Sequence, residues 1–179
     1  MKVLEKFDLL ESPLYGTNLI EASAGTGKTH TITCLFLRLL LEIPLPVSQI
    51  LVVTFTEAAT GELKDRIRSR LREAAAVFSG EETRDEFLVK LWQKFHDKEA
   101  VLACLDEALK SFDQAPIFTI HSFCRRMLHE YAFESGAPFN PELITEQEDI
   151  KREIVDDFWR IHFYWASPLF VNYALEKRF

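Results

Sequence analysis

The sequence predicts an α/β domain in which helices flank a parallel β-sheet and further helices are inserted. Three observations lead to this class. Short apolar runs alternate with segments of helical periodicity, a Gly-rich turn joins the first run to the first such segment, and 47% of the 179 residues are hydrophobic. Alternating strands and helices are typical of parallel sheets, and this composition supports a buried core.

The N-terminal half contains two predicted strand–helix pairs. Residues 18–22 form a short apolar run, and a helix is expected from about Gly27 to Glu42, where apolar residues recur three and four apart. The β-branched run at 50–53 predicts a second strand, buried on both faces as in a parallel sheet. A second helix is expected to begin near Glu57.

The C-terminal half is predicted to be mostly helical. Two apolar stripes within residues 81–114 indicate an inserted pair of helices. A short strand is expected at 117–120, followed by a helix over about 122–133. Gly and Pro residues at 136–141 mark a break, and beyond it an acidic helical stretch leads into a last helix at 169–179.

The composition limits the classes of function. A net charge of −7 and a pI near 5.3 argue against a protein that coats nucleic acid. Local DNA contact through amides, hydroxyls and aromatic rings stays open. No apolar stretch is long enough for a membrane helix, so no membrane association is expected. The three cysteines, Cys34, Cys104 and Cys124, are too scattered for a disulfide or zinc pattern and predict buried thiols in a reducing cytosol.

Residues 22–29 read Ala-Ser-Ala-Gly-Thr-Gly-Lys-Thr and fit the Walker A spacing, except that Ala22 replaces the first Gly. Small residues let successive backbone N–H groups surround a phosphate, and the next helix adds the positive end of its dipole. Lys28 is expected to reach the β- and γ-phosphates of ATP as the catalytic cation, and the Thr29 hydroxyl to bind Mg²⁺. The alternative is a plain Gly-rich turn. The predicted nucleotide contacts are Ser23, Ala24, Gly25, Thr26, Gly27, Lys28 and Thr29.

Three segments together resemble motifs I, Ia and Ib of UvrD-like superfamily 1 DNA helicases, namely residues 19–29, 51–63 and 118–128. Within that superfamily, the residues of these three segments and the sequence Ala-Phe-Glu-Ser-Gly at 132–136 most resemble the corresponding sequences of RecB-type beta subunits of exodeoxyribonuclease V. The resemblance covers about residues 12–145. It implies an ATP- and Mg²⁺-dependent motor that moves 3′-to-5′ on single-stranded DNA from duplex ends. It also implies a role in double-strand-break repair and recombination, in a heterotrimer with RecC-like and RecD-like subunits.

The same resemblance implies how the chain is organised. We expect a RecA-like P-loop NTPase domain over residues 1–139, with its helical insertion at about 81–114, and the start of a helical subdomain over 140–179. No acidic Walker B box follows motif Ib, because the acidic residues at 105–108 precede it and predict a solvated helix face. Since the second motor domain and the nuclease are also missing, we expect an N-terminal fragment with little activity alone.

The candidate DNA contacts lie just after the second and third predicted strands. Phe55 stands between Thr54 and Thr56 at a strand end, where ligands bind in open α/β sheets, and is a candidate base-stacking platform. The alternative is a core phenylalanine. The two threonines are candidate phosphate contacts, or simple caps of the next helix. Thr119 and His121 are candidate contacts to the DNA backbone, with a local helix-end hydrogen bond as the alternative for the histidine.

Two further patterns receive structural interpretations. Basic residues at every second position from Lys64 to Arg72 spread around a helix, so they predict a solvated surface. Phe123, Met127 and Tyr131 recur every four residues and predict core packing. Two rival functions stay open at this point: a P-loop kinase of small molecules or nucleotides, and a module that binds nucleotide without hydrolysing it.

Overall fold

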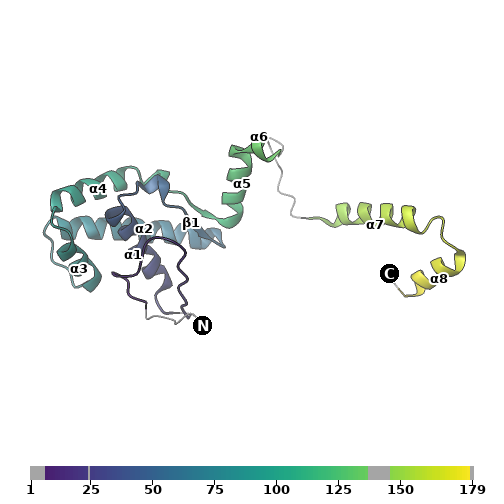
Figure 1. Cartoon of the computed structure of the whole chain (residues 1–179), viewed down its shortest axis with the longest axis horizontal. Helices are drawn as coiled ribbons and strands as arrows, with labels where there is room; N and C mark the ends of the chain where they lie inside the picture. The colour runs from purple at the N-terminus through teal and green to yellow at the C-terminus, as the bar shows by residue number, and fades with distance from the viewer. Residues whose placement is uncertain (1–6, 24, 137–145, 178–179) are drawn as a thin grey trace. The chain divides into compact units, whose positions relative to one another are not determined.

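The computed structural model describes residues 7–23, 25–136 and 146–177, and it divides the chain into two compact units, residues 1–130 and 131–179. Figure 1 shows the first unit as a group of helices beside a small sheet. Its helices are α1 (Lys28–Glu42), α2 (Glu57–Phe78), α3 (Glu86–Lys94), α4 (Lys98–Lys110) and α5 (Ile120–Glu130), with short 3₁₀ turns at Val47–Gln49 and Phe112–Gln114. Each helix expected from the periodicity is present.

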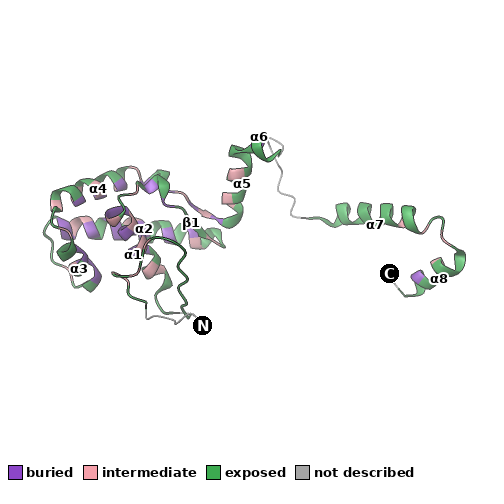
Figure 2. Ribbon diagram, in the orientation of Figure 1, coloured by how far each residue is buried: buried purple, intermediate pink, exposed green. Residues whose placement is uncertain are grey.

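The core of the first unit forms around α2, against which α1, α3 and α4 pack. Buried residues gather on the facing sides of these helices (Figure 2). The inserted pair α3 and α4 contributes fully to this core, because its apolar stripes face α1 and α2. The largest fully buried side chains include Phe36, Leu37, Leu40, Ile67, Leu71, Leu88, Leu91, Leu105 and Ile117.

The sheet has two parallel strands among the described residues, β1 (Val52–Thr54) and β2 (Ile117–Thr119). The strand predicted at 18–22 is not present: Leu19 is 86% exposed, and no neighbouring strand bonds to this segment. Burial of the second strand on both faces is also wrong, because Val53 is 47% exposed. The two errors have different causes, because residues 18–22 have no neighbouring strand with which to bond, whereas one face of β1 is not covered by a helix. The domain is therefore mostly helical, with a small parallel sheet.

The second unit contains α6 (Ala132–Ser135), α7 (Glu148–His162) and α8 (Pro168–Glu176). The end of α7 is linked to α8 by stacked aromatic rings, with ring centroids 4.2 Å apart for Trp159 and Phe163 and 5.5 Å apart for Phe163 and Phe170. The predicted domain boundary at 139/140 falls outside the described residues and stays a prediction.

One residue of the basic run on α2 is not on the surface. The Arg70 side chain is only 6% exposed and donates to Asp85 Oδ2 at 2.5 Å, at the N-terminal cap of α3. It also donates to His30 Nε2 at 2.6 Å and to Cys34 Sγ at 3.1 Å, both on α1. The prediction of a solvated run is thus wrong for Arg70, because this position of α2 faces α1 and the start of α3, whereas Lys64, Arg66 and Arg72 are exposed.

Two other structural interpretations are corrected. None of the residues of α5 is buried, so the core packing predicted for Phe123 and Met127 is wrong. The stripe predicted from periodicity exists, but no element covers it fully within the part of the chain that the structure describes. Of the cysteines, Cys34 is buried, Cys104 is half-buried and Cys124 is exposed. No helix in the described ranges is both long enough and apolar enough to cross a membrane.

Candidate functional site

The Gly-rich segment forms a loop that leads directly into α1. Gly25 and Gly27 adopt φ angles of 78° and 84°, in the left-handed region that glycine tolerates best. Gly27 is the N-cap of α1, and among the described residues no side chain caps this end and no acid lies in the first turn. The backbone N–H groups at this end of α1 are therefore not capped by a side chain of the described residues.

The side chains of the loop are folded over its own backbone. Lys28 Nζ donates to the carbonyl oxygens of Ser23 at 2.6 Å and Ala22 at 3.3 Å, and the Thr26 hydroxyl donates to the Ser23 carbonyl at 2.7 Å. Thr29, the second residue of α1, is half-buried. Ala24 lies outside the described residues. Of the remaining predicted nucleotide contacts, Ser23 and residues 25–28 are exposed, and Thr29 is half-buried in the first turn of α1.

The loop has room for a phosphate group. A Cβ atom built on Gly25 meets nothing within 4 Å, and one built on Gly27 meets only the Cβ of His30 at 4.0 Å. Lys28 can release its two carbonyl acceptors in exchange for phosphate oxygens, because these contacts are exposed and local. The residues present therefore fit the binding of a nucleotide phosphate and its magnesium ion.

The candidate DNA contacts gather at the carboxyl edge of the sheet. Thr54 and Thr119 are the last residues of β1 and β2 and are register partners. Phe55 follows β1 and is 86% exposed, so the alternative of a core phenylalanine is excluded. His121 is exposed in the first turn of α5, which begins immediately after β2. Residues from two distant segments are thus brought to one edge.

The three threonines at this edge already have local hydrogen bonds. The Thr54 hydroxyl is 2.6 Å from that of Thr60, and the Thr56 hydroxyl accepts from the Ala59 amide as the cap of α2. The capping alternative is therefore confirmed for Thr56. Thr119 is only 5% exposed. A contact from these residues to a phosphate stays a prediction, and Phe55 and His121 are the more accessible of the predicted group.

Sequence reasoning missed Glu57, which joins the two turns at this edge. Glu57 Oε1 accepts hydrogen bonds from the hydroxyls of Thr119 at 3.1 Å and Ser122 at 3.2 Å. The Ser122 amide also donates to the Thr119 hydroxyl at 3.1 Å. An acid at the first position of a helix is commonly explained by its favourable interaction with the helix dipole, and that explanation requires no distant partner. Its partners lie more than 60 residues away, so no local pattern could reveal them.

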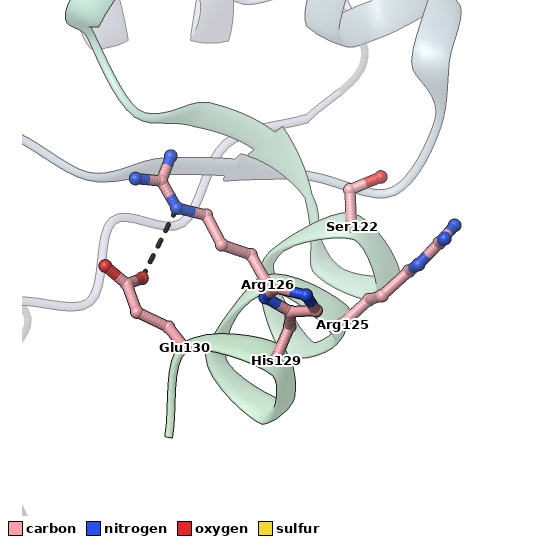
Figure 3. Close-up of a pocket in the computed structure, with 5 residues that line it drawn as sticks. All are labelled: Ser122, Arg125, Arg126, His129 and Glu130. Carbon is pink, nitrogen blue, oxygen red and sulfur yellow. Dashed lines mark ion pairs between the residues drawn. The ribbon is translucent and has the colours of Figure 1, made fainter. Parts of the chain in front are cut away.

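A pocket of about 510 Å³ lies on α5 beyond this edge and is lined by Ser122, Arg125, Arg126, His129 and Glu130 (Figure 3). Within the described residues, no group of three or more His, Cys, Asp or Glu side chains is placed to bind a metal ion. No hydrogen bond or ion pair of the described residues joins the Gly-rich loop to the edge that carries Phe55.

Comparison with known proteins identifies the family. Residues 5–168 match the family described as the UvrD/REP helicase N-terminal domain. The chain is similar to the RecBCD enzyme subunit RecB of Escherichia coli K12, with 46% identity over 90% of the chain, and to that of Haemophilus influenzae Rd, with 48% identity over 85%. A RecB subunit of Mycolicibacterium smegmatis is 35% identical over 91% of the chain.

These relatives are much longer proteins, since the chain spans only 14 to 15% of their length. The matched residues include the Gly-rich loop, both strands and the turns that follow them, which are the parts that carry the candidate contacts. The chain belongs to the UvrD/REP helicase N-terminal domain family.

Proposed function

We propose that this chain is the ATP-binding part of an ATP-dependent DNA helicase and exonuclease subunit that moves 3′-to-5′ on single-stranded DNA. The process served is double-strand-break repair and recombination in the cytoplasm, starting from duplex ends. RecC-like and RecD-like subunits are the proposed partners. The family match and the names of the relatives support this proposal and do not favour the alternative of a small-molecule kinase.

The nucleotide is proposed to bind at the Gly-rich loop and the uncapped start of α1. Backbone N–H groups of residues 23–29 surround the phosphates, with Gly25 and Gly27 allowing the close approach. Lys28 turns from the carbonyls of Ala22 and Ser23 to the β- and γ-phosphates, and the Thr29 hydroxyl holds Mg²⁺. A magnesium ion held there would supply positive charge against the phosphates while the γ-phosphoryl group is transferred from ADP to water.

The exposure of Phe55 is the observation that carries the DNA-binding part of the proposal. A large apolar ring that is 86% exposed between two threonines gains nothing for folding and offers a flat face to a base. Phe55 lies at the carboxyl ends of the parallel strands, and ligands of open α/β sheets bind at that edge. Backbone and hydroxyl groups of Thr54, Thr56 and Thr119 and the ring of His121 surround the same edge and are proposed to contact the strand.

The first prediction separates a motor from a module that only holds nucleotide. We expect single-stranded DNA to stimulate ATP hydrolysis by the whole protein, whereas a polypeptide of residues 1–179 hydrolyses almost none. The reason is that phosphoryl transfer depends on positioned acidic and cationic groups beyond the loop, and the 179 residues contain no acidic box after motif Ib. The rate of phosphate release, measured with and without oligo-dT, tests both polypeptides. If oligo-dT does not change the rate of ATP hydrolysis by the whole protein, the proposal of a DNA motor is contradicted. Rapid hydrolysis by residues 1–179 contradicts the expectation that this polypeptide is almost inactive.

The second prediction concerns Phe55→Ala in the whole protein. Loss of a stacked base should weaken single-strand binding by about 1 to 3 kcal/mol, or roughly 5- to 150-fold. The unfolding midpoint should hardly move, because surface substitutions usually change stability by less than about 0.5 kcal/mol. Phe55→Trp is the matched control, since it keeps an aromatic face and should retain affinity. Unchanged affinity in the alanine variant would remove Phe55 from the DNA site.

A further inference from the structure

The first turn of α1 has little support from the core. It carries Lys28 and Thr29, the side chains proposed to hold the phosphates and Mg²⁺, yet residues 28–32 are all exposed or half-buried. Lys28 bonds only to carbonyls of its own loop. The buried residues of α1 begin at Thr33, so contact of this helix with the core starts one turn after the proposed ligands.

One hydrogen bond joins this first turn to another helix. Arg70 Nη2, on α2, lies 2.6 Å from His30 Nε2. Within the ranges that the structure describes, no other hydrogen bond or ion pair connects residues 28–31 to a different helix. Because a guanidinium can only donate, His30 Nε2 must be the acceptor. The contact therefore needs an acceptor atom at this place, one residue after Thr29.

Arg70 is a well-fixed anchor for this contact. Its side chain is only 6% exposed, and its Nη1 donates to Asp85 Oδ2 at 2.5 Å, at the start of α3. Its Nη2 also donates to Cys34 Sγ at 3.1 Å, one turn after His30 on α1. The planar guanidinium is pre-organised, so it loses little freedom in making several bonds at once. Arg70 thus holds α1 at two points one turn apart.

We propose that His30 is a positioning residue for nucleotide binding, which accepts the hydrogen bond of Arg70 and so fixes the first turn of α1. The inference rests on the nucleotide site proposed above and adds the contact that holds it in place. The backbone of His30 continues directly from Lys28 and Thr29, so a shift of this turn moves both. Outer groups that orient metal ligands typically change metal affinity or activity by about 10- to 100-fold when they are removed.

The test is the affinity of the whole protein for mant-ADP with Mg²⁺, a fluorescent nucleotide whose binding requires no hydrolysis. His30→Ala should weaken this affinity by about tenfold, the lower end of the range for such outer groups. His30→Gln should restore it, because the amide oxygen of glutamine reaches about the place of Nε2. The matched control is His30→Asn, which carries the same amide on a shorter side chain and should bind as weakly as the alanine variant.

Two further variants separate positioning from stability, which thermal unfolding measures in each case. Leu91→Ala removes a fully buried side chain from α3, so it should lower the unfolding midpoint but leave the affinity for mant-ADP unaltered. Arg70→Met already lacks the donor. Adding His30→Ala to Arg70→Met should therefore cause no further loss of affinity, as expected for two residues that act through one contact.

The outcomes distinguish this inference from the function on which it rests. Equal affinities of the Gln and Asn variants overturn it, because the place of the acceptor then does not matter. A further loss in the double variant, or an equal loss in Leu91→Ala, also overturns it. Unchanged affinity in His30→Ala, while Lys28→Ala still abolishes ATP hydrolysis, overturns the positioning role and leaves the nucleotide site standing. Failure of the unmodified protein to bind mant-ADP with Mg²⁺ refutes both proposals.

Discussion

Replacing Lys28 by alanine should abolish ATP hydrolysis by the whole protein. The side chain is the only cation in the predicted loop at 22–29, and its amine already lies over that loop, 2.6 Å from the Ser23 carbonyl. Each charge-assisted hydrogen bond to a phosphate is worth roughly 1.5 to 3 kcal/mol. Loss of two such bonds corresponds to a fall in rate of at least about a hundredfold.

The same substitution should leave the fold intact. Lys28 is exposed and bonds only to carbonyls of its own loop, so its removal takes no contact from the core. Steady-state phosphate release measures the activity, and circular dichroism with a thermal scan measures the fold. Lys64→Ala on the exposed side of α2 is the matched control and should turn over normally. Near-normal turnover by the Lys28 variant would exclude the loop as the site of hydrolysis.

Arg70→Met should destabilise the first unit by about 3 kcal/mol, which is the lower end of the range for removing one partner of a buried ion pair. Arg70 bonds to Asp85 and Glu73 on one side and to His30 and Cys34 on the other. Methionine fills much of the space but leaves these acceptors without their donor. We take the lower end because Asp85 is 29% exposed and keeps part of its hydration.

The ionisation of Asp85 gives this prediction a pH signature. Partial burial raises the pKa of Asp85, but hydrogen bonds from Arg70 and from the amides of Leu88 and Phe87 outweigh burial and hold the pKa below its ordinary value. A carboxyl whose pKa is lower in the folded state adds stability above the unfolded pKa, near 3.9, and this stability is lost as the pH falls through the folded pKa. Arg70→Met should therefore reduce the loss of stability below about pH 4.

Thermal unfolding of the 179-residue chain measures both effects. A loss of about 3 kcal/mol lowers the midpoint by about 10 °C in a protein of this size. Arg72→Met is the control, because Arg72 is exposed two residues further along the same helix and should change the midpoint little. Equal midpoints for the two variants would contradict the buried network and restore the interpretation of a solvated basic run.

The helices of this chain could be predicted from the sequence because each is specified by contacts within itself. Periodic apolar residues placed α1 within one residue at its start, and the inserted pair at 81–114 was recognised from its two stripes. The Gly-rich loop could also be predicted from local sequence, because it is defined by the positions of its glycines and by the helix that follows directly. These features depend on spacing alone.

What could not be predicted depends on partners distant in the chain. The run at 18–22 has the composition of a strand, yet a strand also needs a neighbour with which to bond. Arg70 has the spacing of a surface residue, but Asp85 and His30 come from two other helices. At the candidate DNA edge, the register of Thr54 with Thr119 arises only when β1 and β2 pair.

The hydrogen bonds of Glu57 have a mechanical consequence. One carboxylate oxygen accepts from Thr119 and Ser122, so the turn after β1 is fastened to the turn after β2 by side chains as well as by the sheet. A displacement of the turn that carries Phe55 therefore also pulls on the start of α5 through these two hydrogen bonds.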